Sequence, residues 1–207
     1  MNKEILTTFD EQGHVTGTAP RDEVHRLGLW HETFHCWFVG KDDSGLTVYL
    51  QLRSTQKRDY AGLLDITAAG HLTAGETVQD GVREVQEELG LALAFDELKP
   101  LGIIPYCMDT AGFLDRERAN VFIYENRYAL EDFVLQQEEV AGIVQASFSS
   151  FRSLITGAAD TLRIQGFRIT ADGERVIIDE QAGFTRFVPH EQAYYLQVIK
   201  GIEALFR

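Results

Sequence analysis

Cysteine, proline and long apolar runs are all scarce in this sequence of 207 residues. Its two cysteines, Cys36 and Cys107, lie far apart along the chain, which argues against a disulfide framework and fits a reducing compartment. No apolar run approaches the roughly 18 residues of a membrane-spanning helix, and the first residues lack the apolar core of a signal peptide. We therefore expect a cytoplasmic protein without membrane contacts.

Basic residues are also in deficit. The chain has 19 Lys and Arg against 32 Asp and Glu, a formal charge of −13. Such a field repels nucleic acid and anionic membranes, so we expect neither as a partner. A phosphorylated ligand would be repelled as well, unless cations lie between it and the carboxylates. The apolar content of 44% argues against disorder and predicts a globular fold.

The order of patterns along the chain predicts an α/β core followed by an appended C-terminal unit. A turn at 10–13 predicts an N-terminal hairpin over residues 4–18, and Asp172-Gly173 predicts another over 162–179. Apolar stretches predict strands at 34–39, 46–52, 101–107, 119–124 and 144–148, and helices at 148–156 and 189–206. Residues 21–28 are polar and mixed. We expect one domain over 1–157, with residues 158–207 packed on it as a hairpin and helix.

Residues 70–91 form the most informative segment. Thr77 is a plausible N-cap and Gly90 a plausible C′ residue, which predicts a helix over 77–89. At about 100° per residue, one side of this helix carries an apolar stripe and another side carries three carboxylates. The stripe consists of Val78, Val82, Val85 and Leu89, and the carboxylates are Glu84, Glu87 and Glu88.

Three neighbouring carboxylates repel one another, so they need an explanation. A solvated acidic face is the ordinary one. However, the 22-residue segment contains no lysine to compensate the charge, and a glycine-rich turn from Gly70 to Gly75 leads into the helix. Mg²⁺ binds clustered oxygen ligands and commonly shares them with substrate phosphates. The residues alone thus indicate a carboxylate metal site for a phosphorylated substrate.

The same segment resembles the signature of the Nudix hydrolase superfamily, Gly-x5-Glu-x7-Arg-Glu-U-x-Glu-Glu-x-Gly-U, in which U is a bulky aliphatic residue. The matching residues are Gly70, Glu76, Arg83, Glu84, Val85, Glu87, Glu88, Gly90 and Leu91. One departure is that six residues, not seven, separate Glu76 from Arg83. The resemblance implies a Nudix-type α/β/α sandwich with a mixed sheet.

The resemblance also implies a function, namely hydrolysis of a diphosphate linkage by a metal-activated water, commonly in a nucleoside diphosphate derivative. Mg²⁺, or Mn²⁺, would be held by Glu84, Glu87, Glu88 and the Gly70 carbonyl. Glu88, or Glu138 or Glu139 from a later loop, would act as the base, and Arg83 would hold Glu76. Arg53, Lys57, Arg58 and His71 are candidate substrate contacts. A homodimer is compatible with this family.

Over residues 21–151 the chain is similar to the branch that contains isopentenyl-diphosphate isomerase. The similar stretches are 23–31, 50–54, 65–71 and 135–140. The isomerase needs a cysteine just before the signature, where this chain has Ala68-Ala69. We therefore favour hydrolysis, with isomerisation and a catalytically inactive ligand-binding module as alternatives. The presence of all three signature glutamates argues against the inactive module.

His25, His31 and His71 raise the question of a second metal site, because the isomerases bind a divalent metal with histidines at similar places. Imidazole suits Zn²⁺ and Mn²⁺. The interpretation that we favour from sequence is that His25 and His31 make structural hydrogen bonds, and that His71 lines the pocket. The aromatic residues Trp30, Trp37 and Tyr60 are expected in the core or at the rim of the site rather than stacked on a base.

Overall fold

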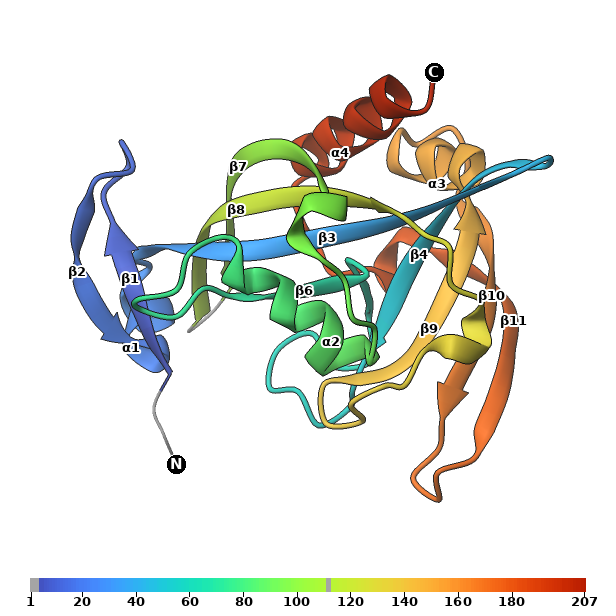
Figure 1. The fold of residues 1–207 in the computed structure, drawn as a ribbon, viewed down its shortest axis with the longest axis horizontal. Coiled ribbons are helices and arrows are strands. Elements are labelled where there is room, and N and C mark those ends of the chain that lie inside the picture. The colour runs from blue at the N-terminus through green and yellow to red at the C-terminus, as the bar shows by residue number, and fades with distance from the viewer. Residues whose placement is uncertain (1–3, 111–112) are drawn as a thin grey trace.

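A long twisted sheet dominates the structure (Figure 1). The computed structural model describes residues 4–110 and 113–207. Its strands are β1 (Ile5–Phe9), β2 (Val15–Pro20), β3 (Trp30–Asp42), β4 (Gly45–Arg53), β5 (Leu64–Asp65), β6 (Ala68–His71), β7 (Lys99–Thr110), β8 (Phe113–Glu125), β9 (Val140–Ser147), β10 (Thr161–Ile169) and β11 (Arg175–Gly183). Its helices are α1 (Arg21–Leu27), α2 (Arg83–Leu89), α3 (Phe148–Ile155) and α4 (Gln192–Leu205).

The sheet is mixed. Its main path runs β11-β10-β9-β4-β3-β1-β2, and β5, β6, β7 and β8 pair off this path. Strand β8 runs parallel to β3, whereas the other pairs are antiparallel. The parallel register places His31 opposite Glu117, so residues of the N-terminal third and of the middle of the chain meet at this end of β3.

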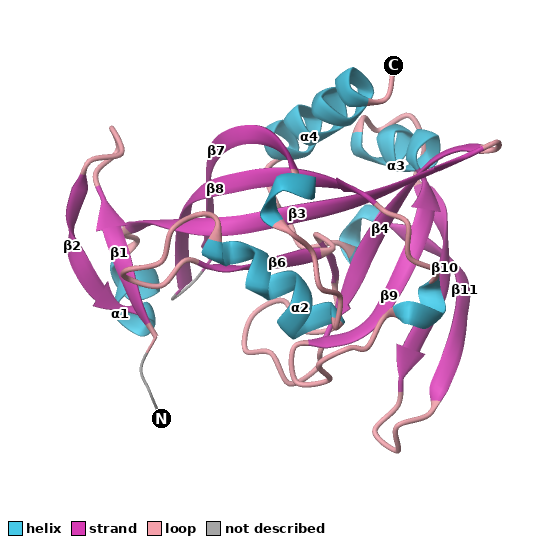
Figure 2. Ribbon diagram, viewed as in Figure 1, coloured by secondary structure: helices cyan, strands magenta, loops and turns pink. Residues whose placement is uncertain are grey.

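Strand β3 separates two apolar layers because successive side chains point to opposite faces. Phe34, Cys36 and Phe38 pack with Val85 and Leu89 of α2. On the other face, the cluster of Trp37 and Val39 includes side chains of α3 and α4. Figure 2 shows α2 on one side of β3 and α3 and α4 on the other. This arrangement confirms the predicted α/β/α sandwich.

Residues beyond 157 extend the same sheet. Strand β10 pairs with β9, Gln165 opposite Gln145, and β11 forms the hairpin with β10 that the sequence predicts. Helix α4 then packs against β7 and α3. The domain boundary at residue 157 stays a prediction. Strand β10, which follows it, pairs with β9, which precedes it, so one sheet contains strands from both sides of the boundary.

Two helix starts differ from the prediction. Helix α2 begins at Arg83 after a 3₁₀ turn at Asp80–Val82, because the N–H and Oγ1 of Thr77 both donate to Asp80 Oδ2 in a local turn. Thr77 is therefore not the N-cap, whereas Gly90 ends the helix with φ 72°, as expected. The C-terminal helix begins at Gln192 rather than at Pro189.

Helix α1 was not predicted, because only Val24 and His25 of its seven residues are buried and no apolar period marks it. None of the helices in the described parts of the chain is long and apolar enough to cross a membrane.

Candidate functional site

A cleft of roughly 680 Å³ opens between α2, β6, β8 and the loop after β4. This volume is in the range of small-molecule sites. Three groups of side chains line it: the signature glutamates, the basic residues of the loop at 53–58, and a cluster of histidines and carboxylates. The candidate catalytic residues, ligands of Mg²⁺ and substrate contacts inferred from the sequence all line this one cleft, as do His25 and His71.

The three glutamates of α2 differ in environment. The side chain of Glu88 is almost fully buried, that of Glu84 is 12% exposed and that of Glu87 is 55% exposed. Glu88 Oε2 accepts hydrogen bonds from the Ala69 amide at 3.1 Å and from Gln51 Nε2 at 3.3 Å. Burial raises the pKa of Glu88 to about 8 and also raises that of Glu84. The helix thus presents one solvated and two desolvated carboxylates to the cleft.

The close approach of β6 to α2 leaves Gly70 no room for a side chain unless Glu84 moves. A Cβ atom at this position would lie 2.2–2.5 Å from the carboxyl group of Glu84. Any side chain would therefore displace Glu84, so the glycine at the start of the signature has a steric reason here.

Arg83 links the loop of the signature to its helix. Its guanidinium donates to Glu76, and its Nη2 also donates to the His71 carbonyl at 3.1 Å. The hydrogen bond from Arg83 lowers the pKa of Glu76 to about 2, although burial opposes this shift. On its other side Arg83 Nη1 contacts Glu84 at 2.5 Å and Glu87 at 3.1 Å. Arg83 thus fixes the loop against β6 and contacts two of the three glutamates.

The three candidate phosphate contacts each have a carboxylate partner. Arg53 pairs with Asp65 at 2.8 Å, and Lys57 pairs with Glu139. Arg58 lies 3.6 Å from Asp22, and both of these side chains are exposed. Arg53 and Lys57 are partly buried in the wall of the cleft, so they are better placed than Arg58 to meet a ligand.

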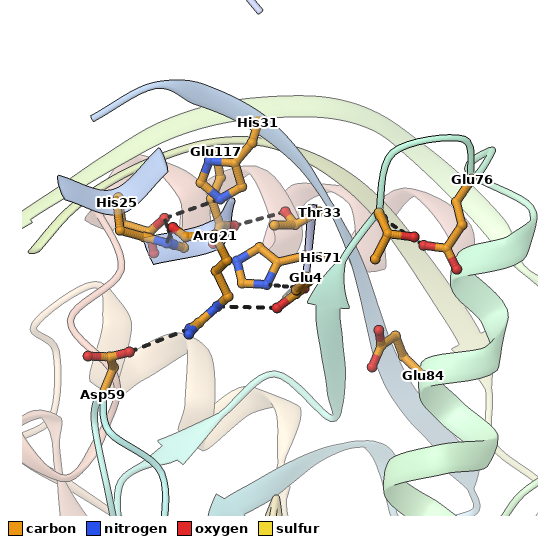
Figure 3. A network of polar contacts seen from close by, with 12 residues as sticks. Glu4, Arg21, His25, His31, Thr33, Asp59, His71, Glu76, Glu84 and Glu117 are labelled. Carbon is orange, nitrogen blue, oxygen red and sulfur yellow. Dashed lines mark hydrogen bonds and ion pairs between the residues drawn. The ribbon is translucent and has the colours of Figure 1, made fainter. Parts of the chain in front are cut away.

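The histidine cluster is the feature that the sequence left open (Figure 3). Nδ1 of His25 lies 2.9 Å from the Arg21 carbonyl and Nδ1 of His31 lies 3.0 Å from the Leu29 carbonyl. A carbonyl can only accept, so both Nδ1 atoms carry the proton and both Nε2 atoms are left as acceptors in the neutral ring. These Nε2 atoms lie 3.4 and 3.5 Å from Oδ1 of Asp115.

The same atoms are buried and lack hydrogen-bond partners among the described residues, namely His25 Nε2, His31 Nε2 and Asp115 Oδ1. Burial lowers the pKa of His31 to about 3, so its ring is neutral near pH 7. Ligand atoms of His25, His31 and His71 all lie within 4.8 Å of one another, as do those of His31, Asp115 and Glu117. Three imidazoles beside two carboxylates form a donor set that suits Zn²⁺ or Mn²⁺.

The structural hydrogen bonds expected of His25 and His31 are therefore present, but only on one nitrogen of each ring. Asp115 and Glu117 were missed, because the sequence 113–118 is highly charged and lies before the apolar stretch from which the strand was predicted. Residues 115, 117, 119, 121 and 123 alternate along β8 and are all buried, which only the structure shows for the two carboxylates.

Neither cysteine lines the cleft within the parts of the chain that the structure describes. Cys36 is buried in the layer beneath α2, Cys107 is partly exposed on β7, and neither forms a disulfide bond in the described part of the chain. Ala69, directly before Gly70, lines the cleft. Trp37 is fully buried, as expected, and its indole N–H donates to the Tyr194 hydroxyl.

A model of the NUDIX domain matches residues 29–172. The chain belongs to the Nudix family. It is 34% identical over 202 residues to an uncharacterized Nudix hydrolase of Clostridium acetobutylicum, with 98% of each chain covered. It is 37% identical over 92 residues to an isopentenyl-diphosphate Delta-isomerase of Mycolicibacterium vanbaalenii, which covers 44% of this chain and 49% of that one.

The fold is shared with a solved structure from Deinococcus radiodurans, with a TM-score of 0.57 and 18% identity over 74% of this chain and 90% of that one. With the match over 29–172, these likenesses identify the protein as an enzyme of the Nudix pyrophosphohydrolase type. The family uses divalent metal cations, which agrees with the carboxylates gathered in the cleft.

Proposed function

We propose that this Nudix enzyme hydrolyses a diphosphate linkage in a small phosphorylated molecule, commonly a nucleoside diphosphate derivative, with Mg²⁺ as the cofactor. The observation that carries the proposal is that one cleft collects the glutamates of α2, Arg53 from the end of β4 and Lys57 from the loop that follows. A protein with a net charge of −13 can accept an anionic substrate there, because cations stand between the substrate and the carboxylates.

Glu84, Glu87 and Glu88 are the residues that would hold Mg²⁺, since hard cations prefer clustered carboxylate oxygens. The bound cation would supply charge neutralisation at the phosphates and activation of water. The protein itself orients the phosphates through Arg53 and Lys57. Glu88 is fixed by the Ala69 amide, and this backbone contact holds one carboxylate oxygen in place.

Glu139 and Glu88 are the two candidates for accepting the proton of the attacking water. Glu139 is held by Lys57 in the structure. If Lys57 exchanges this partner for a substrate phosphate, the carboxylate of Glu139 becomes free to accept a proton next to the bound phosphate. Substrate binding and activation of the base would then be linked through one lysine.

We propose in addition that the histidine cluster holds a second divalent cation, of the Zn²⁺ or Mn²⁺ type. Its support is the set of buried, unpartnered atoms on His25, His31 and Asp115. The cluster lies in the same cleft as the glutamates, and Ala69 offers no thiol for isomerisation. Hydrolysis therefore remains the reaction that the cleft supports best.

The test is a screen of nucleoside diphosphates, nucleotide sugars, dinucleotides and cofactor diphosphates with Mg²⁺ or Mn²⁺, read as released phosphate or nucleotide. We expect turnover of at least one class, with products cleaved at the diphosphate linkage, and loss of turnover in Glu88→Gln. Tight binding of a compound without turnover in the parent protein would favour a ligand-binding module instead.

A further inference from the structure

His190 lies outside the residues matched by the NUDIX domain, 29–172, yet it lines the cleft. Phe187 forms a parallel bridge to Leu64, and the Val188 amide donates to the Leu64 carbonyl at 2.9 Å. The segment after β11 therefore runs beside β5, and His190 comes to lie against Asp65. His190 is only 6% exposed.

Asp65 joins His190 to the phosphate-binding candidate Arg53. Its Oδ1 lies 2.8 Å from His190 Nε2 and accepts the Ile66 amide at 2.8 Å, and its Oδ2 accepts from Arg53 Nη1 at 2.8 Å. Burial alone would raise the pKa of Asp65, but the hydrogen bond from His190 and the charge of Arg53 hold it below its usual range. The carboxylate is thus ionised and can only accept, so His190 Nε2 is the donor.

Arg53 is held at two points. Besides its bond to Asp65, its Nη2 donates to the Asp59 carbonyl at 2.9 Å. A guanidinium has five N–H groups in a fixed plane, so these two bonds set the plane of the group. Arg53 Nε is buried, and the second N–H of Nη1 and of Nη2 is left for a ligand. A small rotation of the Asp65 carboxylate would turn this plane away from its present direction.

We propose that His190 is a positioning residue of the active site, which fixes the guanidinium of Arg53 through Asp65 for a substrate phosphate. The proposal rests on the proposed function, because it assigns Arg53 to phosphate binding. It gives the C-terminal segment a role beyond packing, since that segment completes the hydrogen-bond set of a buried carboxylate in the cleft. Partners one step behind a binding group commonly change affinity by roughly tenfold to a hundredfold when they are removed.

The experiment measures the affinity of the full chain for methylenediphosphonate, a diphosphate analogue that is not hydrolysed, in the presence of Mg²⁺ by calorimetry. His190→Leu removes the donor, whereas His190→Gln keeps an N–H near the position of Nε2. We expect His190→Leu to weaken binding roughly tenfold or more and His190→Gln to recover most of the affinity. Asp65→Asn should reproduce the loss, which keeps the test valid if His190→Leu does not fold.

The control is Tyr195→Phe. The hydroxyl of Tyr195 donates to the Val188 carbonyl at 2.9 Å, so this change weakens the docking of the same segment without touching Asp65. It should lower the melting temperature and leave the affinity unchanged. In an Arg53→Ala background His190→Leu should have no further effect on affinity, because the two residues act through one path.

Two results would overturn the proposal. If the parent protein binds methylenediphosphonate and His190→Leu lowers only the melting temperature, His190 has a structural role alone and the proposed function stands. If the parent protein binds the analogue and Arg53→Ala binds it equally well, the assignment of Arg53 to phosphate binding fails, whereas failure of the parent protein itself to bind the analogue with Mg²⁺ would count against the proposed function.

Discussion

Arg83 donates two hydrogen bonds to Glu76, at 2.6 and 3.1 Å, although only six residues separate them in the sequence. The shorter connection therefore does not prevent the contact that the family signature implies. Glu76 also accepts the Thr73 amide at 2.6 Å, so the carboxylate closes the turn that leads into α2. The loop and the helix of the signature are joined through this one pair.

Arg83→Lys should destabilise the protein, because a lysine cannot supply the planar fork that contacts Glu76 and the His71 carbonyl together. We expect the free energy of unfolding in urea to fall by about 1–2 kcal/mol. This is at the low end for hydrogen bonds between charged groups, because the side chains of Arg83 and Glu76 are both partly exposed. Arg58→Lys is the matched control, since its contact with Asp22 is exposed. Equal stability of the parent protein and Arg83→Lys would contradict this account of the pair.

Glu87→Gln and Glu88→Gln should each reduce hydrolysis by roughly 10²–10³ or more, because an amide donates far less charge to Mg²⁺ than a carboxylate does. Stability without metal should be kept, because Glu87→Gln removes a charge that repels Glu84, and Glu88→Gln replaces a buried carboxyl group whose charged form is disfavoured. Steady-state rates on the substrate found by the screen, with melting curves in EDTA, check both points. Full activity of both variants would contradict the assignment of the catalytic metal to these glutamates.

The pKa of Glu88 predicts how stability without metal depends on pH. Burial raises this pKa from its ordinary value near 4.5 to about 8. The folded protein thus binds the proton of Glu88 more tightly than the unfolded chain does. The contribution of this proton to the free energy of unfolding is complete below about pH 4.5 and is lost as pH rises through about 8. The free energy of unfolding of the parent protein, measured in EDTA, should fall between pH 5 and 9, and this fall should be absent in Glu88→Gln. An identical pH profile for both proteins would rule out the raised pKa.

Much of the fold could be predicted from local patterns. The two hairpins follow from their turns, and helix α3 follows from its apolar period, because these signals lie within a few residues of the element they determine. The three glutamates of α2 could be placed on one face from helical geometry alone. The start of α2 could not, since it depends on the bond between Thr77 and Asp80, which competes with a longer helix.

The remainder of the site depends on contacts between distant residues. Asp115 reaches His25 and His31 only because β8 pairs in parallel with β3, and parallel register leaves no local signal in the sequence. His190 reaches Asp65 across 125 positions of the chain. The sequence therefore identified the residues of the signature, whereas the partners that orient the histidines and Arg53 required the fold.

Replacing Cys36 and Cys107 together by alanine should leave hydrolysis within a few-fold of the parent rate. Neither thiol forms a disulfide bond among the described residues, and burial raises the pKa of Cys36 well above its usual range, so its thiol stays protonated and unreactive. The melting temperature should fall modestly, because Cys36 packs under α2. A loss of activity by orders of magnitude with the fold intact would instead bring isomerase-like chemistry back.

The histidine cluster should bind one Zn²⁺ or Mn²⁺ ion independently of the glutamates of α2. In the metal-free protein His25, His31 and Asp115 keep buried atoms without partners among the described residues, and a cation would satisfy all three together. A ligand that binds only the folded state raises its stability, so added Zn²⁺ should raise the melting temperature of the parent protein.

His31→Gln should abolish most of this rise and lower the metal content by one ion per chain, measured by elemental analysis after dialysis. His31 is the residue to change because its ligand atom belongs to both metal-binding groups, one with His25 and His71 and one with Asp115 and Glu117. Glu87→Gln should keep the ion, since Glu87 lies in neither group. His14→Gln is the control for weak binding at an exposed histidine, because its side chain is 78% exposed beside Asp10. If His31→Gln and the parent protein retain equal amounts of metal, the cluster serves only to fill the end of the cleft with hydrogen-bonded rings, and the cation must lie among the glutamates.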